Sequence, residues 1–340
     1  MRRRKTHTFR AIILLAVLAG LLLYFLFQSV YNSNLKAVDV DDQRNLKFEV
    51  KQGWSVSQIA VSLEEEDLIR SAWAFKKYVE QNADDTAFQA GSFVLRKSYD
   101  IAETVEVLSG TPNEMWMTIL EGWRASDIGS YLEEKGYATQ QAFLDCVATC
   151  EFDYEILSSI PEDQGLEGYL FPDTYIITPA TEVYGMINRT LMNLDQKLEQ
   201  ELRNQAEKQG RSIHEIMTMA SLLEREVRGY EDRQIVAGLL WKRLEAGMGL
   251  GVDATVLYAL GDWKATLDHE ALQIDSPYNT RKYAGLPPGP ICSPSLSSIK
   301  AALNPVDSPY WFYLTTLDTG EVIYSKNLDE HNENVYKYLR

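Results

Sequence analysis

The feature that most constrains this chain is an uncharged apolar segment that begins ten residues from the N-terminus. Residues 11–27 carry no charged side chain, and residues 28–31 extend the segment to roughly the length that crosses a bilayer. A cleaved signal peptide is the alternative, but its apolar region would be shorter and would end in small residues. Bulky side chains end this segment instead: Tyr24, Phe25 and Phe27. We therefore expect a retained transmembrane helix over residues 11–30.

Basic residues set the expected orientation of this helix. Five of the first ten residues are Arg or Lys, and positive charge stays on the cytoplasmic side of a membrane. Residues 1–10 are therefore expected to form a cytoplasmic tail, with the rest of the chain outside the cytoplasm. Residues 31–44 are polar and lack apolar periodicity, which is typical of a stalk. The remaining length is sufficient for two or more domains.

Charge and motif content argue against several kinds of function. The formal net charge is −16, and an acidic surface repels nucleic acid, so no nucleic-acid partner is expected. Four histidines stand at no metal-ligand spacing and no nucleotide-binding glycine motif occurs, so we expect neither a metal nor a cofactor. Cys146 and Cys150 could pair outside the cytoplasm, an outcome that their helical spacing leaves open. Cys292 is expected to be a buried, inert thiol.

A weak internal repeat follows the stalk. Residues 48–63 align with residues 117–132, and each copy predicts a short strand, a Gly-Trp turn and an amphipathic helix. The expected helix N-caps are Ser55 or Ser57 in the first copy and Ser126 in the second.

Between the two copies, residues 90–96 predict a strand and residues 101–108 a helix. We expect a β-α-α-β order for this region, and this order resembles LysM, a small glycan-binding module. We assign residues 45–112 to this LysM-like module, with a plain α+β packing unit as the alternative.

The strongest helix signal lies between residues 212 and 227. Ser212 and Glu215 form a capping box. The apolar residues that follow share one stripe at helical spacing: Ile213, Ile216, Met217, Ala220, Leu223 and Val227. Glu224 projects about 40° from the centre of this stripe. Because an apolar face disfavours a charge, we expect its carboxyl to stay protonated near neutral pH, as a general acid for glycoside cleavage requires.

Glu224 also has a purely structural interpretation. A Glu at the edge of an apolar stripe is often paired with an Arg, and Arg243 is a candidate partner. Glu226 points about 120° away from the centre of the stripe, so we expect it to be an ordinary solvated carboxylate.

Polar loops follow the helical region. Helix signals dominate residues 126–245, with one long helix expected over residues 181–209, and loops take over after residue 270. Such loops can line a groove for a polysaccharide, and the candidate lining residues are Asp253, Thr255, Ser276, Tyr278, Asn279 and Thr280. Singly, each also has a structural role as a helix cap or turn former. Residues 310–316 and 322–325 predict a β-hairpin, followed by a short helix from about Asn332.

Six segments, in order, resemble the membrane-anchored endolytic murein transglycosylases, the MltG or YceG-like family. They are Glu167–Tyr175 (EGYLFPDTY), Ala220–Glu226 (ASLLERE), Asp253–Tyr258 (DATVLY), Ser276–Thr280 (SPYNT), Gly285–Gly289 (GLPPG) and the closing His331-Asn332. The resemblance covers residues 45–340. The sequence departs from the family pattern at Ala254, where a proline is common.

This resemblance implies an α+β fold. It consists of the N-terminal transmembrane helix, the small LysM-like module, and a mainly helical catalytic domain over residues 113–340 with a C-terminal β-hairpin. The implied reaction cleaves the β-1,4 bond between N-acetylmuramic acid and N-acetylglucosamine within peptidoglycan strands and leaves 1,6-anhydro ends. Glu224 falls at the position of the family's general acid and base. Glu226 joins the six groove residues named above as a candidate for substrate binding.

The resemblance also implies partners and a location. These are peptidoglycan glycan strands, peptidoglycan synthases of the elongation or division machinery, and the plasma membrane of a bacterium, spanned once with the N-terminus inside. Two other functions stay open. A muramidase-type hydrolase would use a second carboxylate, and a non-catalytic wall-binding scaffold would use Glu224 only for structure.

Overall fold

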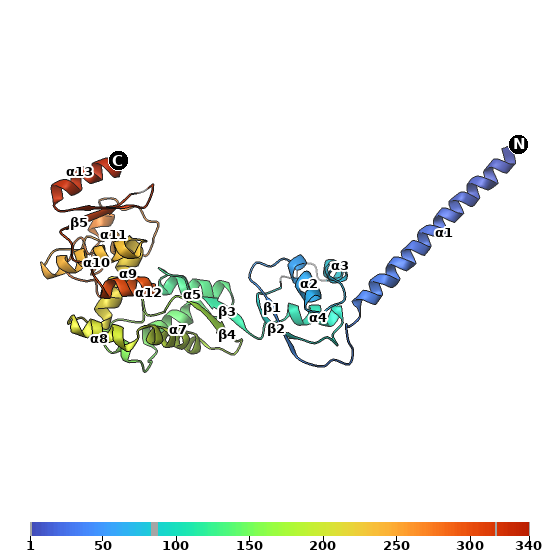
Figure 1. Cartoon of the computed structure of the whole chain (residues 1–340), viewed down its shortest axis with the longest axis horizontal. Coiled ribbons are helices and arrows are strands. Elements are labelled where there is room, and N and C mark those ends of the chain that lie inside the picture. Colours follow the sequence, from blue (N-terminus) through green and yellow to red (C-terminus); the bar gives the residue numbers. More distant parts are fainter. Residues whose placement is uncertain (1, 83–87, 317, 340) are drawn as a thin grey trace. The chain divides into compact units, whose positions relative to one another are not determined.

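The computed structural model describes residues 2–82, 88–316 and 318–339, and in the first helix it describes the side chains at residue 15 and from residue 17 onward. The chain is α+β and forms two compact units (Figure 1). The first unit contains Met1–Trp116 and Ile176–Ala180, and the second contains Met117–Tyr175 and Thr181–Arg340. Each unit is described below by itself.

The chain begins with one 34-residue helix, α1 (Arg2–Leu35). Within the part of the chain that the structure describes, no helix combines the length and the apolar character that crossing a membrane requires. The transmembrane helix expected over residues 11–30 includes residues 11–14 and 16, whose side chains lie outside the described part. Phe27 and Tyr31, near the end of α1, each meet Trp73 edge-on.

A two-stranded antiparallel sheet and three helices form the core of the first unit. These elements are β1 (Leu46–Val50), α2 (Val56–Glu65), α3 (Ala72–Asn82), β2 (Gly91–Leu95) and α4 (Ile101–Ser109). Phe48 of β1 pairs with Phe93 of β2, and both side chains are buried. The predicted β-α-α-β order is confirmed, and the N-cap of α2 is Ser55, in a capping box with Gln58. The likeness to LysM stays a prediction.

A second pair of strands, β3 (Met115–Thr118) and β4 (Thr174–Ile177), runs from one unit into the other. After β3 the chain turns and enters α5 (Ala125–Glu134), the helix of the second repeat copy. The prediction of Ser126 as its N-cap is wrong. The helix begins two residues earlier than that cap implies, and the cap position is held by Arg124, whose backbone N–H donates to the Asp127 carboxylate at 3.0 Å.

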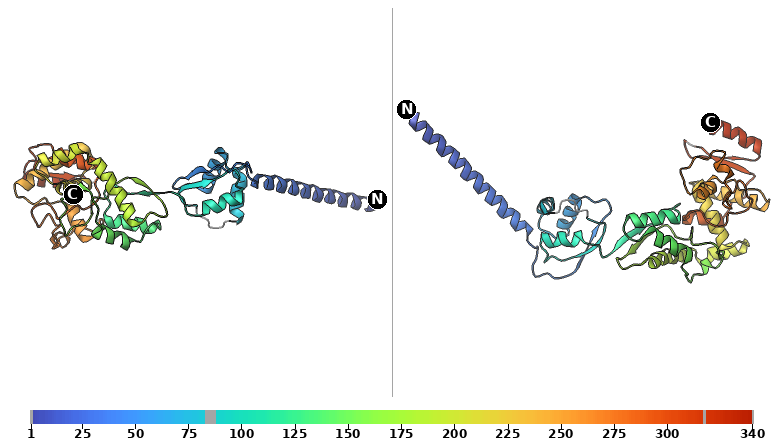
Figure 2. Two further views of the ribbon diagram at one scale, coloured as in Figure 1. Left: turned by 90° about the horizontal axis from the view of Figure 1, so that it is seen from below. Right: turned by 180° about the vertical axis from the view of Figure 1, so that it is seen from behind.

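The second unit is mainly helical (Figure 2). Its remaining elements are α6 (Gln140–Thr149), η1 (Glu155–Leu157), α7 (Val183–Lys197), α8 (Gln200–Lys208), α9 (Ile213–Glu226), α10 (Tyr230–Glu245), α11 (Asp253–Leu260), η2 (Ala271–Gln273), α12 (Leu296–Leu303), β5 (Phe312–Thr315), β6 (Val322–Ser325) and α13 (Leu328–Tyr338). Helix α9 packs against α8, α10, α11 and α12 and so lies in the core of this unit.

Two expectations for this unit are revised by the structure and two are confirmed. The single helix expected over residues 181–209 is two helices, because Leu198 leaves the helical conformation and Arg203 donates to the free carbonyls of Leu198 and Asp195. The C-terminal helix starts at Leu328, four residues earlier than expected, and lies beside the β5–β6 ribbon (Figure 1). The predicted hairpin is confirmed as antiparallel β5–β6. Cys292 is buried as expected, and burial raises the pKa of its thiol well above the ordinary value.

The structure also resolves the question of the two neighbouring cysteines. Cys146 and Cys150, at the end of α6, are joined by a disulfide. A disulfide is typical of an oxidising, extracytoplasmic environment.

Candidate active site

The helix that carries Glu224 forms as the sequence predicts. Ser212 caps α9, the Ser212 hydroxyl accepts from the Glu215 backbone N–H at 3.1 Å, and the Glu215 carboxylate accepts from the Ser212 N–H at 2.8 Å. Burial extends beyond the predicted stripe, because eight consecutive residues from Ile216 to Leu223 are all buried. Glu224 therefore stands at the point where a buried helix reaches polar surroundings.

The carboxylate of Glu224 lies among hydrogen-bond donors rather than against apolar side chains. Its side chain is 7% exposed, and Oε1 accepts from Nη2 of Arg233 at 3.0 Å. Its Oε2 accepts from the Ser295 backbone N–H at 2.9 Å, the Ser295 hydroxyl at 2.5 Å and the Ser298 hydroxyl at 2.7 Å. The expected apolar surroundings are therefore wrong, and that Glu224 carries a proton stays a prediction.

The cation beside Glu224 is not the one expected from the sequence. Arg233, in the first half of α10, forms the ion pair and is itself 9% exposed. Arg243 instead donates to the backbone carbonyls of Trp311 and Leu250, at 2.8 and 2.6 Å. Arg233 and Arg243 both lie on α10, the helix that follows Glu224 in the sequence. Only Arg233 faces α9, and the sequence alone could not indicate which of the two would do so.

The other partners of Glu224 come from the start of α12. Ser295 is the N-cap of this helix, and its hydroxyl accepts from the Ser298 backbone N–H at 3.2 Å. The positive end of the helix dipole therefore faces the carboxylate. The sequence signal was present, since Ser295 follows Pro294 just before an apolar helical run, but nothing in it indicated what the cap would bind.

Glu121, which was not among the residues predicted for the site, lies close enough to Glu224 for the two charges to interact. Glu121 precedes Gly122 in the turn after β3 and is exposed. Partial burial and then the charge of Glu224 raise the pKa of Glu121, against the opposing effect of Arg233. A Cβ at Gly122 would lie 4.0 Å from Cγ of Glu224, so this turn is packed against the Glu224 side chain.

The turn that carries Glu121 is fixed by the segment that leads to α12. The Gly122 N–H donates to the carbonyl of Ser293 at 2.8 Å, and the Ser293 N–H donates to the carbonyl of Trp123 at 2.7 Å. Gly122 has a φ of +74°, a conformation that other residues adopt at a cost. The repeat predicts only a Gly-Trp turn here, because the position of this turn beside Glu224 depends on tertiary packing.

The expectation for Glu226 is wrong. Its carboxylate accepts from the Tyr313 hydroxyl of β5 at 2.9 Å, and burial raises the pKa of Glu226. The hairpin that covers Glu226 was predicted, but its place over the end of α9 was not. Asp253 begins α11 and pairs with Arg281, whose Nε lies 2.6 Å from Oδ1, and its side chain is 48% exposed.

Three of the candidate groove residues are buried and make structural contacts. The Thr255 and Thr280 hydroxyls lie 2.9 Å apart, and Thr280 Oγ1 also accepts from the Val252 backbone N–H at 3.0 Å. Asn279 donates to the backbone carbonyls of Leu272 and Ile274, both at 3.0 Å. These contacts match the turn-forming alternative and fix the loop against α11.

The other two candidates lie nearer the surface. The Ser276 hydroxyl accepts from the Tyr278 N–H at 3.2 Å. The Tyr278 hydroxyl donates to Gln164 at 3.1 Å, and its ring centroid lies 4.7 Å from that of Tyr258. Burial raises the pKa of Tyr278 to about 12, so this hydroxyl keeps its proton at neutral pH.

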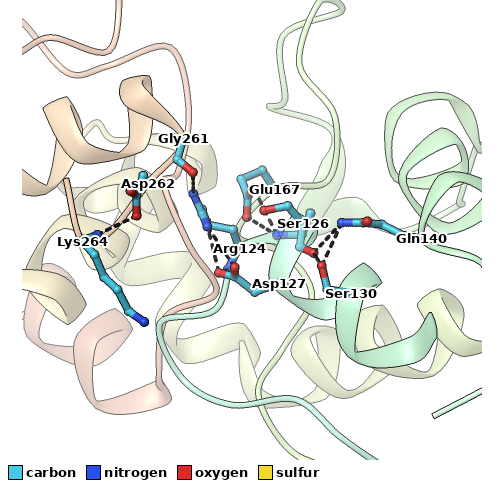
Figure 3. Close-up of polar contacts among 10 residues, drawn as sticks. Arg124, Ser126, Asp127, Ser130, Gln140, Glu167, Gly261, Asp262 and Lys264 are labelled. Atoms are coloured by element: carbon cyan, nitrogen blue, oxygen red, sulfur yellow. Dashed lines mark hydrogen bonds and ion pairs between the residues drawn. The ribbon is translucent and has the colours of Figure 1, made fainter. Parts of the chain in front are cut away.

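A second polar cluster surrounds the start of α5 (Figure 3). The Glu167 carboxylate accepts from the Ala125 N–H at 3.1 Å, and burial raises the pKa of Glu167 to about 7. Arg124 binds the Asp127 carboxylate at 2.9 Å and the carbonyl of Gly261 at 2.8 Å. This cluster attaches the loop after α11 to α5. Among the side chains that the structure describes, no group of three or more His, Cys, Asp or Glu could hold a metal ion.

Comparison with known proteins agrees with this architecture. The model of the YceG-like family matches residues 48–337. The chain therefore belongs to the YceG-like family.

Named relatives cover nearly the whole chain. It is similar to the endolytic murein transglycosylase of Bacillus subtilis, with 34% identity over 90% of this chain and 88% of the relative. It is also similar to the endolytic murein transglycosylase of Streptococcus pneumoniae, with 31% identity over 93% of this chain and 62% of that longer protein. A crystal structure of a YceG-like protein from Listeria monocytogenes matches with a TM-score of 0.67 and 31% identity, over 85% of this chain and 98% of that one.

Proposed function

We propose that this protein is a lytic transglycosylase, a lyase that cleaves peptidoglycan strands internally at the bond between N-acetylmuramic acid and N-acetylglucosamine. The observation that carries the proposal is the position of Glu224. Glu224 lies in the last turn of α9, directly after the buried part of this helix. Its carboxylate accepts a hydrogen bond from the N-terminus of α12, and its side chain lies beside the Glu121–Gly122 turn. The relatives named above bear this activity in their names.

The reaction needs one carboxyl group. Protonated Glu224 gives its proton to the glycosidic oxygen, and the bond from that oxygen to C1 of the muramyl residue breaks. The muramyl 6-hydroxyl then attacks C1 and returns its proton to the Glu224 carboxylate, so a 1,6-anhydro ring forms and no water is consumed. Each partner of Glu224 has a role in this cycle.

These partners act on different protonation states. Arg233, Ser295 and Ser298 stabilise the carboxylate that remains after proton donation. Glu121 has the opposite effect, because its negative charge and that of the Glu224 carboxylate repel each other. A substrate that excludes water strengthens both effects.

Hydrolysis of the same bond is the second candidate, and Glu121 is the observation that favours it. A muramidase uses a second carboxylate to activate water or attack the sugar, and Glu121 is exposed in the electrostatic range of Glu224.

Mass spectrometry of digested glycan strands distinguishes the two reactions. A transglycosylase gives muramyl ends that are lighter than reducing ends by one water. Reducing ends in the wild-type digest would contradict the transglycosylase, and if the Glu121→Gln variant then lost activity, the muramidase would replace it.

The remaining seven candidates have distinct proposed roles. Tyr278 and Ser276 bind substrate from the loop surface, and Glu226 and Asp253 support the end of α9 and the start of α11. Thr255, Asn279 and Thr280 hold the loop in place. A Tyr278→Phe variant tests the first role, because it should raise KM and leave folding unchanged.

The first unit acts as a glycan-binding LysM-like module in this proposal. Trp54 and Val61 are accessible beside a surface pocket of about 400 Å³, which is also lined by Ser57, Gln58, Ser62 and Glu65. An accessible aromatic ring beside the polar side chains of Ser57, Gln58 and Ser62 suits a sugar. Trp54→Ala should weaken co-sedimentation with insoluble peptidoglycan, whereas Trp73→Ala on α3 should not.

Residues 11–30 anchor the protein in the bacterial plasma membrane in this proposal, with residues 1–10 inside and the chain from residue 31 onward outside. The support is the uncharged apolar segment after a basic cluster and the disulfide in the second unit. From this position the enzyme terminates or trims nascent strands beside peptidoglycan synthases. Resistance of the membrane-bound protein to extraction at high salt and alkaline pH tests the anchor, and crosslinking in cells tests the synthase contact.

A further inference from the structure

Arg225 lies in the candidate active site but has no part in the reaction proposed above. It follows Glu224 on α9 and is exposed. The two neighbouring arginines are paired, Arg124 with Asp127 and Arg233 with Glu224. In the described ranges of the chain, Arg225 forms no ion pair with a carboxylate. An exposed cation beside the proposed catalytic carboxylate is therefore available to a ligand.

The guanidinium of Arg225 is nevertheless held in place. It lies 4.1 Å from the ring centroid of Trp263, and Arg124 lies over the same ring at 5.0 Å. A Cβ at Gly122 would lie 3.3 Å from Nη1 of Arg225 and 4.0 Å from Cγ of Glu224. Arg225 therefore lies between the indole and the Gly122 turn, and it approaches the same point as Glu224. A cation fixed by an aromatic face loses less freedom when it binds an anion.

The chemistry of the guanidinium defines the ligand. Its planar set of N–H donors matches the two oxygens of a carboxylate, and such bidentate contacts are directional. The surroundings are acidic, with Glu121 in the adjacent turn and a net charge of −16 for the chain. Arg225, with Arg124 over the same indole ring, offsets that repulsion for a substrate carboxylate at this point.

We propose that Arg225, stacked on Trp263, is a specificity subsite that binds a carboxylate carried by the muramyl residue. The inference rests on the proposed function. In a strand of alternating sugars, only the muramyl residue carries a carboxylate, either on its lactyl group or on its stem peptide. A fixed cation therefore distinguishes the two sugars and sets which of the two β-1,4 bonds lies at Glu224. Arg225 is thus a register-setting residue and takes no part in proton transfer.

The test uses the full chain in detergent and three substrates. They are peptide-bearing strands, peptide-free strands with free lactyl carboxylates, and peptide-free strands whose carboxylates have been converted to methylamides. On the strands that carry the carboxylate bound by Arg225, the Arg225→Gln variant should raise KM about tenfold and leave kcat nearly unchanged. On the methylamide strands, wild type and variant should be equal. Arg228→Gln removes an exposed charge three residues further on and should change neither value.

The substrates also identify the source of the carboxylate. In peptide-bearing strands the lactyl carboxyl is amide-bonded to the stem peptide, so an effect of Arg225→Gln on peptide-free strands alone assigns the lactyl group. An effect on peptide-bearing strands alone assigns the stem peptide, and an effect on both shows that the subsite accepts either carboxylate. An unchanged KM on all three substrates overturns the proposal. An equal rise in KM on the methylamide strands also overturns the proposal, because the variant would then have damaged the site for every substrate.

A binding measurement separates this inference from the proposed function. Glu224→Gln and Glu224→Gln/Arg225→Gln are sedimented with insoluble peptidoglycan whose carboxylates are free or amidated. Carboxylate-dependent binding that the double variant loses supports the subsite even if the wild type cleaves nothing. Equal binding by both variants overturns the subsite even if the wild type is an active transglycosylase.

Discussion

Replacing Arg233 by methionine should reveal how strongly the fold depends on its ion pair with Glu224. Both side chains are almost inaccessible, at 9% and 7% exposure, and their charged atoms lie 3.0 Å apart. Methionine keeps much of the length of the arginine side chain but removes the charge. The Glu224 carboxylate would then remain buried without a cation, retaining only its contacts with Ser295 and Ser298.

The expected magnitude follows from the geometry of the pair. Removing one partner of a buried pair costs about 3–5 kcal/mol of unfolding free energy. Arg233 also donates to the Val227 carbonyl and the Ser295 hydroxyl, contacts worth about 1 kcal/mol each. In a Glu224→Gln background, Arg233→Met leaves no buried charge behind and loses only the other contacts of Arg233, so it should cost only about 1–2 kcal/mol there. The coupling energy of the cycle is therefore about 2–3 kcal/mol.

Urea unfolding followed by circular dichroism measures the four members of this cycle. Arg211 and Glu245 supply a control cycle in the same unit, because their charged atoms are 3.7 Å apart and Glu245 is 74% exposed. The control coupling should stay below about 1 kcal/mol. If the Arg233–Glu224 coupling is no larger than that of the control, the pair does not stabilise the site in the way described here.

Three further predictions concern other parts of the site. The pKa of Glu167 is about 7 when folded and lower when unfolded, so the folded protein retains a proton that the unfolded chain releases. Stability should therefore fall by up to about 3 kcal/mol between pH 4.5 and 7, and urea unfolding of Glu167→Gln should lack that fall. Tyr313→Phe removes the hydroxyl that donates to buried Glu226 and should cost about 1–3 kcal/mol in thermal unfolding. Gly122→Ala forces a φ of +74° on alanine and should lower the unfolding free energy by about 1–2 kcal/mol. Activity should fall by more than this loss of stability explains, because the new Cβ meets Arg225.

Local signals predicted the elements that support the site. The capping box at Ser212 and Glu215 and the helical spacing of the apolar residues defined α9, and both depend only on neighbours within one helix. The same is true of the β5–β6 hairpin, whose strands are separated by a short turn. The break between α7 and α8 was missed, because Arg203 stabilises it through contacts that the apolar pattern does not record.

The environment of each functional carboxylate depended on distant parts of the chain. Glu224 meets Ser295 and Ser298, about seventy residues away, and Glu226 meets Tyr313, 87 residues away. Helix geometry correctly placed the two glutamates on different faces. It could not indicate that the first would face the start of α12, nor that the hairpin would cover the second. Tertiary packing decided both.

The central claim is that the carboxyl of Glu224 breaks the glycosidic bond, and one comparison tests it most directly. The full chain, its Glu224→Gln variant and a Glu207→Gln control on the exposed face of α8 are incubated with peptidoglycan strands, and the muramyl ends are counted by mass spectrometry. Wild type and control should give equal yields of anhydro ends, and Glu224→Gln should give none above background. Equal cleavage by Glu224→Gln would contradict the claim. No cleavage by the wild type would also contradict it and would favour a wall-binding scaffold.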